Sequence, residues 1–440
     1  MRTLPRTHTL LALALAAALT GCANTPRAVP KPFVPERMSA EDRQAAYAEV
    51  VTLIQTRYID ASHNGVAWSA VAERYRQKVL DAPDDRRFWE ELNRLVGELK
   101  DAHSRVLSPL DIKATREQRG NHGLEMRPRD GRWLLTQVAG SSQAALQGLR
   151  PGLQVLQVDG QPVQQWWAEQ AEKVRGSSTE RSQQVLINGK LNGGEVGSER
   201  RLQLRRSDGS EFEITLRQDA LQAPAVRSHL LPDGTGYLRF MAFGGALRTD
   251  LDHALRRLAP AKGLVLDLRG NPGGDLKLTT ELLGWFLPPG EVGKVVTRDN
   301  KRLTALLGLL DITPDLQVKA QAQRLQQPLA VLIDERSASA AELMAAALQA
   351  KGRARVFGAT SCGCLLGVRG QGEALRGGGR LVFSEIELLV DGQPRIEGVG
   401  VVPHEAVWND PGEMLLGRDA VLAAARQWLK QTLEAPPAGA

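Results

Sequence analysis

Two segments of this 440-residue chain share one design, and together they constrain the fold more than any other feature. The apolar run Gly263–Leu268 leads into the turn Arg269–Gly274, and the apolar run Leu329–Ile333 leads into the turn Asp334–Ser339. Short apolar runs bounded by turn residues are typical of buried strands, and each turn is followed by a segment with a helical pattern. We therefore expect a core of alternating strands and helices, in which strands end in tight turns that open helices.

The second of these turns places Ser339 at the expected N-terminus of a helix. Backbone N–H groups at such a position favour negative charge. The first turn ends in Gly273 and Gly274, where the absence of a Cβ lets the backbone approach a substrate closely. The N–H of Ala340 and that of Gly273 or Gly274 could bind a developing oxyanion, so the pattern favours nucleophilic attack by Ser339 on a carbonyl.

The segments Arg269–Gly274 and Ser337–Glu342 resemble the oxyanion and nucleophile segments of the C-terminal processing (tail-specific) serine peptidases. This resemblance extends from about residue 40 to 410. It implies an α/β core like that of ClpP and crotonase, acyl-enzyme chemistry at Ser339, and no cofactor or metal. The other interpretation is that Ser339 only caps its helix, with Glu342 as the third helical residue.

The general base is where the chain departs from most of that family. The resemblance aligns Gly358–Leu365 with a turn that usually carries a catalytic lysine, and here that position is Cys364. Lys351 lies too far back along the intervening helix to replace it. A tricorn-like branch uses Ser, His and Glu instead, and its pattern falls on His103 and Glu397. The resemblance thus implies that His103 is general base and acid and that Glu397 orients its imidazole.

Each of these residues also has a simpler interpretation. His103 could be a surface or interdomain histidine, Glu397 could pair with Arg395, and His404 is a residual candidate. Cys362 and Cys364 could form a strained disulfide or a redox-sensitive neighbour of the site, but they are too few ligands for structural zinc. Direct catalysis by Cys364 lacks a visible activating base.

The N-terminus has the pattern of an export signal. Basic Arg2 and Arg6 precede the apolar run Leu10–Leu19, which is too short to span a bilayer. The segment Leu19–Cys22 resembles a bacterial lipobox, which implies lipidation of Cys22, and Ala23 after it favours the outer membrane. A plain secretory signal is the alternative. We expect a periplasm-facing envelope protein held by a lipid anchor and a proline-rich tether.

Between the tether and the core, helical spacing gives way to strand patterns. Residues 123–126 and 133–138, a short helix closed by Gly148, and a strand ending in Asp159-Gly160 resemble a PDZ domain. The resemblance implies a peptide groove at Gly123, Leu124, Glu125 and Met126, which adds a peptide strand and captures a C-terminus. The polar run 176–199 is expected to be a mobile insertion, and Val163–Lys173 is expected to be a helix of this domain. In the core we expect strands at Gly236–Phe240 and Leu381–Val390, and a single helix over 412–434.

These patterns divide the chain into a signal peptide (1–22), a tether (23–38), a helical N-terminal domain (39–117), a PDZ domain (118–218) and an α/β peptidase core (219–434). The arginines behind the net charge of +6 are scattered, which argues against nucleic acid as a partner. Peptides or unfolded proteins are the expected partners. Two functions stay open: an envelope serine endopeptidase, or an inactive scaffold that keeps the fold and the groove. An activated serine probe separates them.

Overall fold

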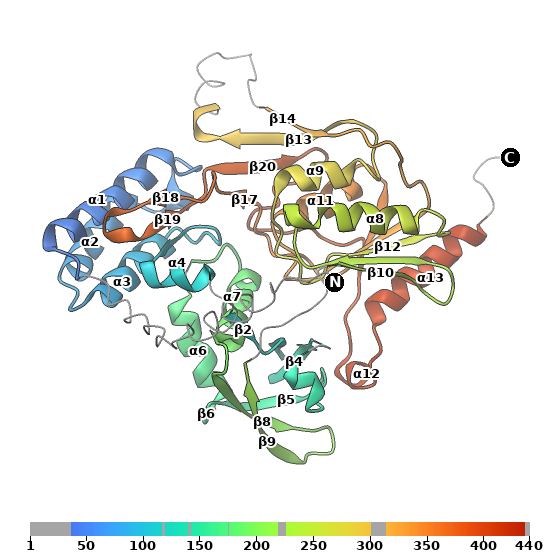
Figure 1. Ribbon diagram of the computed structural model, residues 1–440, viewed down its shortest axis with the longest axis horizontal. Coiled ribbons are helices and arrows are strands. Elements are labelled where there is room, and N and C mark those ends of the chain that lie inside the picture. Colours follow the sequence, from blue (N-terminus) through green and yellow to red (C-terminus); the bar gives the residue numbers. More distant parts are fainter. Residues whose placement is uncertain are drawn as a thin grey trace, which may run out of the picture. The chain divides into compact units, whose positions relative to one another are not determined.

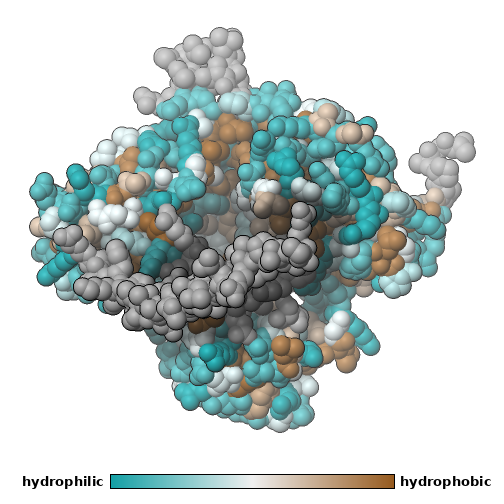
Figure 2. Space-filling model, in the orientation of Figure 1, coloured by the Kyte–Doolittle hydropathy of each residue, from teal (hydrophilic) through white to brown (hydrophobic). Residues whose placement is uncertain are grey.

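The computed structural model describes residues 37–116, 119–139, 142–174, 176–218, 226–300 and 314–435 (Figure 1). The expected signal peptide, Cys22 and most of the tether lie outside these residues. Within the described part of the chain, no helix has both the length and the apolar character needed to cross a membrane. On the face shown in Figure 2, hydrophilic residues predominate and hydrophobic ones occur in small groups.

The N-terminal region is helical, as predicted. Its helices are α1 (Ala40–Arg57), α2 (Trp68–Leu80), α3 (Asp85–Gly97) and α4 (Pro109–Arg116). Ser39 and Asp84 cap α1 and α3 by accepting N–H bonds from the first turn, which explains where these helices begin. Strand β1 (Arg105–Leu107) was not predicted; it pairs with a distant strand, β19 (Arg380–Val382). This ladder joins the helical region to the core.

Residues 119–217 form an antiparallel sheet with three helices. The main strands follow the order β3-β4-β5-β8-β9, with β6 beside β5 and a separate pair made by β2 and β7. The strands are β2 (Arg119–Asn121), β3 (Leu124–Arg129), β4 (Arg132–Val138), β5 (Gln154–Val158), β6 (Gln161–Pro162), β7 (Gly193–Glu195), β8 (Glu199–Arg205) and β9 (Glu211–Arg217). The helices are α5 (Gln143–Leu146), α6 (Val163–Lys173) and α7 (Glu180–Asn192). The predicted order of elements is present, and its interpretation as a PDZ domain stays a prediction.

Helix α7 corrects the expectation of a mobile insertion at 176–199. Thr179 caps it, and Ile187 and Leu191, four residues apart on one face, are fully buried in the core of this domain. An apolar face of only two residues is a weak signal for a helix. The helix forms because burial of this face in the domain core stabilises it. The segment is therefore an ordered part of the domain.

The α/β core is built on a six-stranded sheet with the order β10-β11-β12-β15-β16-β21. Its strands are β10 (Val226–Leu230), β11 (Gly236–Phe240), β12 (Leu264–Asp267), β15 (Leu329–Ile333), β16 (Ala354–Gly358) and β21 (Glu405–Ala406). Strands β10 and β11 are antiparallel, and the other neighbours are parallel. The mixed α/β core is thus confirmed.

Helices cover both faces of this sheet, because successive residues of a strand point to opposite faces. Leu329, Val331 and Ile333 of β15 pack with α8, α9 and α11, whereas Ala330 and Leu332 pack with α13. Figure 1 shows α8, α9 and α11 grouped together and α13 apart from them. The core helices are α8 (Arg248–Leu258), α9 (Leu276–Leu283), α11 (Ala340–Ala350), α12 (Pro411–Leu415) and α13 (Ala420–Glu434). A strand buried on both faces explains the continuous apolar run at 329–333.

Two single elements expected near the C-terminus are each divided in the structure. The strand expected at 381–390 becomes β19 and β20 (Ile386–Val390), which lie in different sheets. The chain bends between them at Ser384, whose N–H donates to Ser104 Oγ and whose carbonyl accepts from Ile59 N–H. The helix expected at 412–434 is divided into α12 and α13, because Asp419 caps a new helix. The remaining strands are β13 (Gly290–Thr297), β14 (Asp315–Val318), β17 (Leu366–Gly367) and β18 (Glu373–Ala374).

Candidate active site

Ser339 lies in the turn between β15 and α11, at the N-cap of α11. An ordinary N-cap has extended backbone angles, whereas Ser339 has φ 54° and ψ −118°. A non-glycine residue in this region is strained, and such strain is held in place by its surroundings. The surroundings are two acceptors for the Ser339 N–H: the carbonyl of Cys364 at 3.1 Å and the Glu342 carboxylate at 3.0 Å. The capping role expected for Ser339 and Glu342 is therefore present, but in a strained turn.

The turn that ends in Gly273 and Gly274 packs directly against Ser339. A Cβ added to Gly273 would lie 2.7 Å from Ser339 Cβ and 2.7 Å from Ala340 N, so only glycine fits there. A Cβ on Gly274 would lie 2.4 Å from the carbonyl oxygen of Phe243. The structure thus brings the two segments together, although they are far apart in the sequence.

The N–H groups in this contact are not equivalent. Gly273 N–H donates to Asn271 Oδ1 at 2.9 Å. Within the described residues, the N–H groups of Ala340 and Gly274 have no acceptor. A hole for an oxyanion needs donors that are free before substrate arrives. The geometry therefore favours Ala340 with Gly274 over Ala340 with Gly273.

Glu342 holds this half of the site together. Its buried carboxylate accepts four bonds, from Ser339 N–H (3.0 Å), Cys364 N–H (2.9 Å), Gly363 N–H (2.7 Å) and the Ser361 hydroxyl (2.6 Å). Burial raises the pKa of Glu342, and these donors oppose the rise. The sequence showed Glu342 only as part of a helix cap, because its other partners follow it by about 20 residues. Glu342 thus fixes the turn that contains Cys362 and Cys364 to the Ser339 turn.

Cys362 and Cys364 form a disulfide with a Cα–Cα separation of 5.3 Å. The disulfide expected from their spacing is therefore present. Cys364, which the sequence resemblance aligns with the usual lysine, has no thiol in this state and cannot act as a base or nucleophile. Lys351 follows the last residue of the 11-residue helix α11, about 18 Å along its axis from Ser339. Neither Cys364 nor Lys351 therefore offers a base to Ser339 in this structure.

Glu397 lies next to this turn. Its Oε2 accepts the N–H groups of Leu365 at 2.6 Å and Leu366 at 3.1 Å. Burial raises the pKa of Glu397 to about 7, and the nearby carboxylates of Asp101 and Glu342 add to the rise. Arg395, the alternative partner of Glu397, forms its ion pair with Glu387 at 2.6 Å. His404 accepts the N–H of Val356 in strand β16, so its ring has a structural role.

His103 lies in a loop whose backbone is fixed by Asp101. The His103 N–H donates to Asp101 Oδ1 at 2.8 Å, and Ser104 also donates to this carboxylate. The His103 Nδ1 is 3.9 Å from Asp101 Oδ1 and has no hydrogen-bond partner among the described residues. Burial lowers the pKa of His103; Asp101 opposes this shift and Arg105 adds to it. The imidazole is therefore neutral near pH 7, as a general base requires.

Ser178 connects the His103 loop to Glu397. Its hydroxyl accepts Ala102 N–H at 3.0 Å and hydrogen-bonds the Glu397 carboxyl group. In the described part of the chain, His103 makes no hydrogen bond to Glu397 or to Ser339. The structure thus brings the loops of His103 and Glu397 to one serine, and the catalytic roles of both residues stay predictions. No sequence pattern indicated Ser178.

The expected peptide groove is not open. Strand β3 is an edge strand, but Leu124 and Met126 direct their backbone groups to the side-chain amides of Asn192 and Asn188 in α7. The Glu125 side chain points instead into a buried ion-pair cluster, where it contacts Arg127 at 2.6 Å and Arg336 at 2.8 Å. The expectation that Gly123–Met126 receives a peptide strand is therefore not met in this structure.

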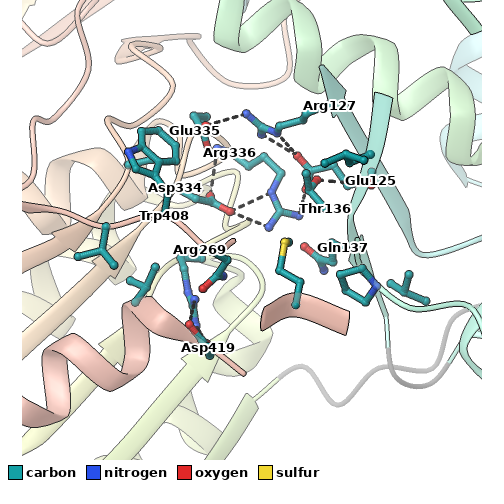
Figure 3. Close-up of a pocket in the computed structure, with 18 of the residues that line it drawn as sticks. Glu125, Arg127, Thr136, Gln137, Arg269, Asp334, Glu335, Arg336, Trp408 and Asp419 are labelled. Carbon is teal, nitrogen blue, oxygen red and sulfur yellow. Dashed lines mark hydrogen bonds and ion pairs between the residues drawn. The ribbon is translucent and has the colours of Figure 1, made fainter. Parts of the chain in front are cut away.

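That cluster lines a cavity of about 670 Å³ between β3, β4 and the end of β15. Figure 3 shows Arg336 between Glu125 and Asp334, with Arg127 directed at Glu335. Burial alone would raise the pKa of Asp334, but Arg336 and Arg127 hold it below its usual range. The charges in this cluster satisfy one another, so it fixes β3 to the segment that precedes Ser339.

Two parts of the chain are similar to known protein families. Residues 234–407 match the model of peptidase family S41, and residues 39–97 match the Tricorn protease C1 domain. The S41 match covers strands β11 to β21, including the Ser339 turn. The chain is 24% identical over 389 residues to the carboxyl-terminal-processing peptidase 3, chloroplastic, of Arabidopsis thaliana, an alignment that covers 82% of this chain and 68% of that protein. Its homologues are C-terminal processing proteases.

Solved structures show the same fold. The photosystem II D1 C-terminal processing protease matches with a TM-score of 0.59 at 21% identity, covering 86% of this chain and 98% of that chain. Mature CPAF matches with a TM-score of 0.63 at 15% identity, covering 90% of this chain and 97% of that chain. The expected similarity to C-terminal processing peptidases is thereby confirmed at the level of the S41 domain and its fold.

Proposed function

We propose that this protein is a serine endopeptidase that cleaves unfolded or tail-bearing proteins through an acyl-enzyme. The observation that carries the proposal is the strained Ser339 turn packed against Gly273 and Gly274, with the N–H groups of Ala340 and Gly274 free. A nucleophile beside preorganised donors is the arrangement that acyl transfer requires. The S41 match and the C-terminal processing homologues support the choice of a peptide substrate.

In this mechanism, Ser339 Oγ attacks the scissile carbonyl while His103 Nε2 takes its proton. The oxyanion binds Ala340 N–H and Gly274 N–H. The intermediate collapses, the C–N bond breaks, and the leaving amine takes the proton from His103. Water then attacks the acyl-enzyme by the reverse proton path, which releases the acid and restores Ser339.

Glu397 orients His103 in this proposal, with Ser178 between their loops. Because the His103 Nδ1 is unpaired and Glu397 does not reach it, the triad is not closed without substrate. Hydrogen bonds in substrate-free sites are often long and shorten only in the complex. The substrate is therefore expected to complete the catalytic geometry.

The test is cleavage of an unfolded protein such as casein, together with labelling by an activated fluorophosphonate probe. Ser339→Ala should abolish both, and His103→Ala should abolish cleavage while thermal unfolding stays unchanged. Leu110→Ala, an exposed change in α4, serves as the control. Cleavage that persists in Ser339→Ala would exclude this mechanism.

The inactive scaffold is the second candidate. The observation that favours it is the position of Cys364, which a disulfide occupies in place of a lysine. A scaffold would leave Ser339 unlabelled by the probe in the wild-type protein, even after candidate tail peptides are added. Labelling of the wild type but not of Ser339→Ala excludes it.

The location is also a proposal. The basic residues, apolar run and Leu19–Cys22 segment support export and lipidation of Cys22, with the protein facing the periplasm from the outer membrane. Cys22→Ala should release the protein from the membrane fraction and abolish labelling by a radioactive fatty acid. Retention of the label in this variant would exclude lipidation at Cys22.

A further inference from the structure

Strand β3 lies at the edge of its sheet, and side chains of helix α7 pair with the backbone groups of that edge. Asn192 accepts Leu124 N–H at 2.8 Å and donates to the Leu124 carbonyl. Asn188 accepts Met126 N–H at 2.9 Å and donates to the Met126 carbonyl at 3.0 Å. These are the N–H and C=O groups that a peptide added as an extra strand would bind.

The match between helix and strand follows from their repeats. Asn188 and Asn192 are four residues apart, so they lie on one face of α7 about 6 Å apart along its axis. Leu124 and Met126 are two residues apart, so their backbone groups face one edge about 6.8 Å apart. Each side-chain amide offers one donor and one acceptor, as a neighbouring strand residue would. Two asparagines at this spacing therefore replace two residues of a bound strand.

Contacts other than those of Asn188 and Asn192 also hold helix α7 in place. Ile187 and Leu191 are fully buried in the core beneath β3. Beyond the helix, β7 pairs with β2, and Gln218 Nε2 donates to the Asn192 carbonyl at 2.5 Å. Removing α7 from the edge would expose Ile187 and Leu191. It would also disturb the β2–β7 pairing and the bond from Gln218 to Asn192. The occupant is thus part of the folded domain.

The N-terminal end of the same helix contacts the two loops that carry the candidate site. Thr179 Oγ1 donates to the Cys362 carbonyl at 2.6 Å. Arg181 donates through Nε to the Ser361 carbonyl at 2.7 Å and through Nη2 to the Val399 carbonyl at 2.5 Å. One guanidinium therefore connects the turn of the disulfide to the loop that follows Glu397.

The contact between these parts is close. A Cβ on Gly363 would lie 2.9 Å from Thr179 Cγ2, and a Cβ on Gly400 would lie 3.2 Å from Arg181 Nη2. Ser178, directly before the cap, bonds Ala102 N–H and the Glu397 carboxyl group. The segment 178–181 thus meets the His103 loop, the disulfide turn and the Glu397 loop at once.

We propose that α7 is the permanent internal ligand of the β3 edge and that its first turn, through Thr179 and Arg181, positions the catalytic loops. The second half of this proposal rests on the proposed function at Ser339. Because the edge is already paired, substrate tails do not bind there by strand addition. Arg181 is a positioning residue: it touches two loop carbonyls and holds their relative distance.

The first experiment tests the internal ligand without measuring activity. Amide hydrogen exchange at Leu124 and Met126 is compared in the wild type, in Asn188→Ala/Asn192→Ala, and in Lys190→Ala, an exposed change on the same helix. The double variant should exchange at least about tenfold faster at both amides, and the control should not. Binding of a C-terminal peptide to the wild type, seen as protection or shifts at Leu124 and Met126, would overturn the proposal. Equal exchange rates at Leu124 and Met126 in all three proteins would also overturn the proposal.

The second experiment tests positioning by separating kcat from KM. Arg181→Ala should lower kcat about 10- to 100-fold with KM within about twofold, because it misplaces catalytic loops without touching substrate. Arg181→Lys keeps the charge but reaches only one of the two carbonyls, so it should restore kcat only in part. Arg205→Ala, which removes an exposed pair with Glu211, is the control and should match the wild type.

The outcomes separate this proposal from the proposed function. Full activity in Arg181→Ala, or complete rescue by Arg181→Lys, would overturn the positioning role while Ser339 chemistry stands. An inactive wild type whose Ser339 does not react with a probe would remove the proposed function and with it the positioning role, and the exchange experiment would still decide the internal ligand.

Discussion

The two halves of the candidate site differ in how completely their polar groups are paired. Around Ser339, the Glu342 carboxylate accepts four bonds and the N–H groups aimed at substrate are the free ones. Around His103, the Nδ1 is unpaired, and the pKa of Glu397 is raised to about 7. In the proposed mechanism, the Ser339 half is therefore preorganised, whereas the loops of His103 and Glu397 come together only when substrate binds. Mutations in the Ser339 half should lower folding stability and activity together. Mutations in the half that contains His103 and Glu397 should change activity and its pH dependence.

The largest expected effect is that of Glu342→Ala. It leaves the buried N–H groups of Gly363 and Cys364 and the Ser361 hydroxyl without this acceptor, and each such group costs about 1–3 kcal/mol. We expect the free energy of unfolding to fall by about 4 kcal/mol or more, measured by denaturant unfolding. Glu90→Ala, at a partly exposed glutamate of α3 paired with two arginines, should change it by less than about 1 kcal/mol. A loss as small as that control would show that Glu342 does not hold the turn.

Gly274→Ala tests the free donors. The added Cβ would lie 2.4 Å from the Phe243 carbonyl oxygen, and the φ of 142° disfavours a side chain. The N–H is expected to move away from the oxyanion, which should lower kcat about 100- to 1000-fold. Gly245→Ala, where a Cβ has open space, is the matched control. Similar kcat values for both variants would assign the second donor elsewhere.

The raised pKa of Glu397 predicts that the folding stability of the protein depends on pH. The pKa of Glu397 is about 7 in the folded protein and about 4.3 in an unfolded chain. Between these values the folded chain keeps a proton that the unfolded chain has lost. Raising the pH through this window should therefore lower the free energy of unfolding, by about 3 kcal/mol in total.

The measurement is denaturant unfolding at pH 4.5 and pH 8 for the wild type and Glu397→Gln. The variant cannot titrate there, so it should lose most of the difference between the two pH values. Glu90→Gln should keep it. An unchanged difference in Glu397→Gln would place the titrating group elsewhere and leave Glu397 ionised at neutral pH.

Much of the local structure followed from the sequence. Strands β11 and β15 and helix α6 have the bounds that the patterns predicted, because each is decided by its own apolar spacing. The tight turn at Ser339 and its glycine partner were also predictable from the two similar segments, whereas the strained backbone of Ser339 was not. Local pattern and tertiary packing agree in these elements.

The remainder depends on contacts between distant residues. Asn188 and Asn192 are ordinary helix residues until β3 lies beside them, and Glu342 is an ordinary cap residue until the disulfide turn meets it. The bend at Ser384 likewise exists because Ser104 pairs with it. Such side chains carry no periodic signal, so the occupied groove and the split strand could not be predicted.

Two carboxylates compete for the role of orienting His103, and they can be compared directly. Asp101 Oδ1 is 3.9 Å from His103 Nδ1, whereas Glu397 connects to the His103 loop only through Ser178. If substrate closes the proposed triad, Glu397→Gln should lower kcat about 30-fold or more and Asp101→Asn should lower it less. Steady-state kinetics on one peptide decides this. The reverse order would make Asp101 the orienting carboxylate.

The smallest expected effect is that of the disulfide, although the sequence resemblance aligns Cys364 with the lysine base of most tail-specific peptidases. Glu342 binds the N–H groups of Gly363 and Cys364 whether or not their neighbouring sulfurs are joined. The cross-link closes a very short loop, so its entropic contribution is only about 1.5 kcal/mol. Reduction should lower the free energy of unfolding by about that amount, and kcat should stay within about threefold, a barrier change of about 0.7 kcal/mol. A Cys362→Ala/Cys364→Ala variant should behave as the reduced wild type does and should not respond to reductant. A much larger loss of kcat in both would mean that the disulfide, and not Glu342, holds the carbonyl of Cys364 against Ser339.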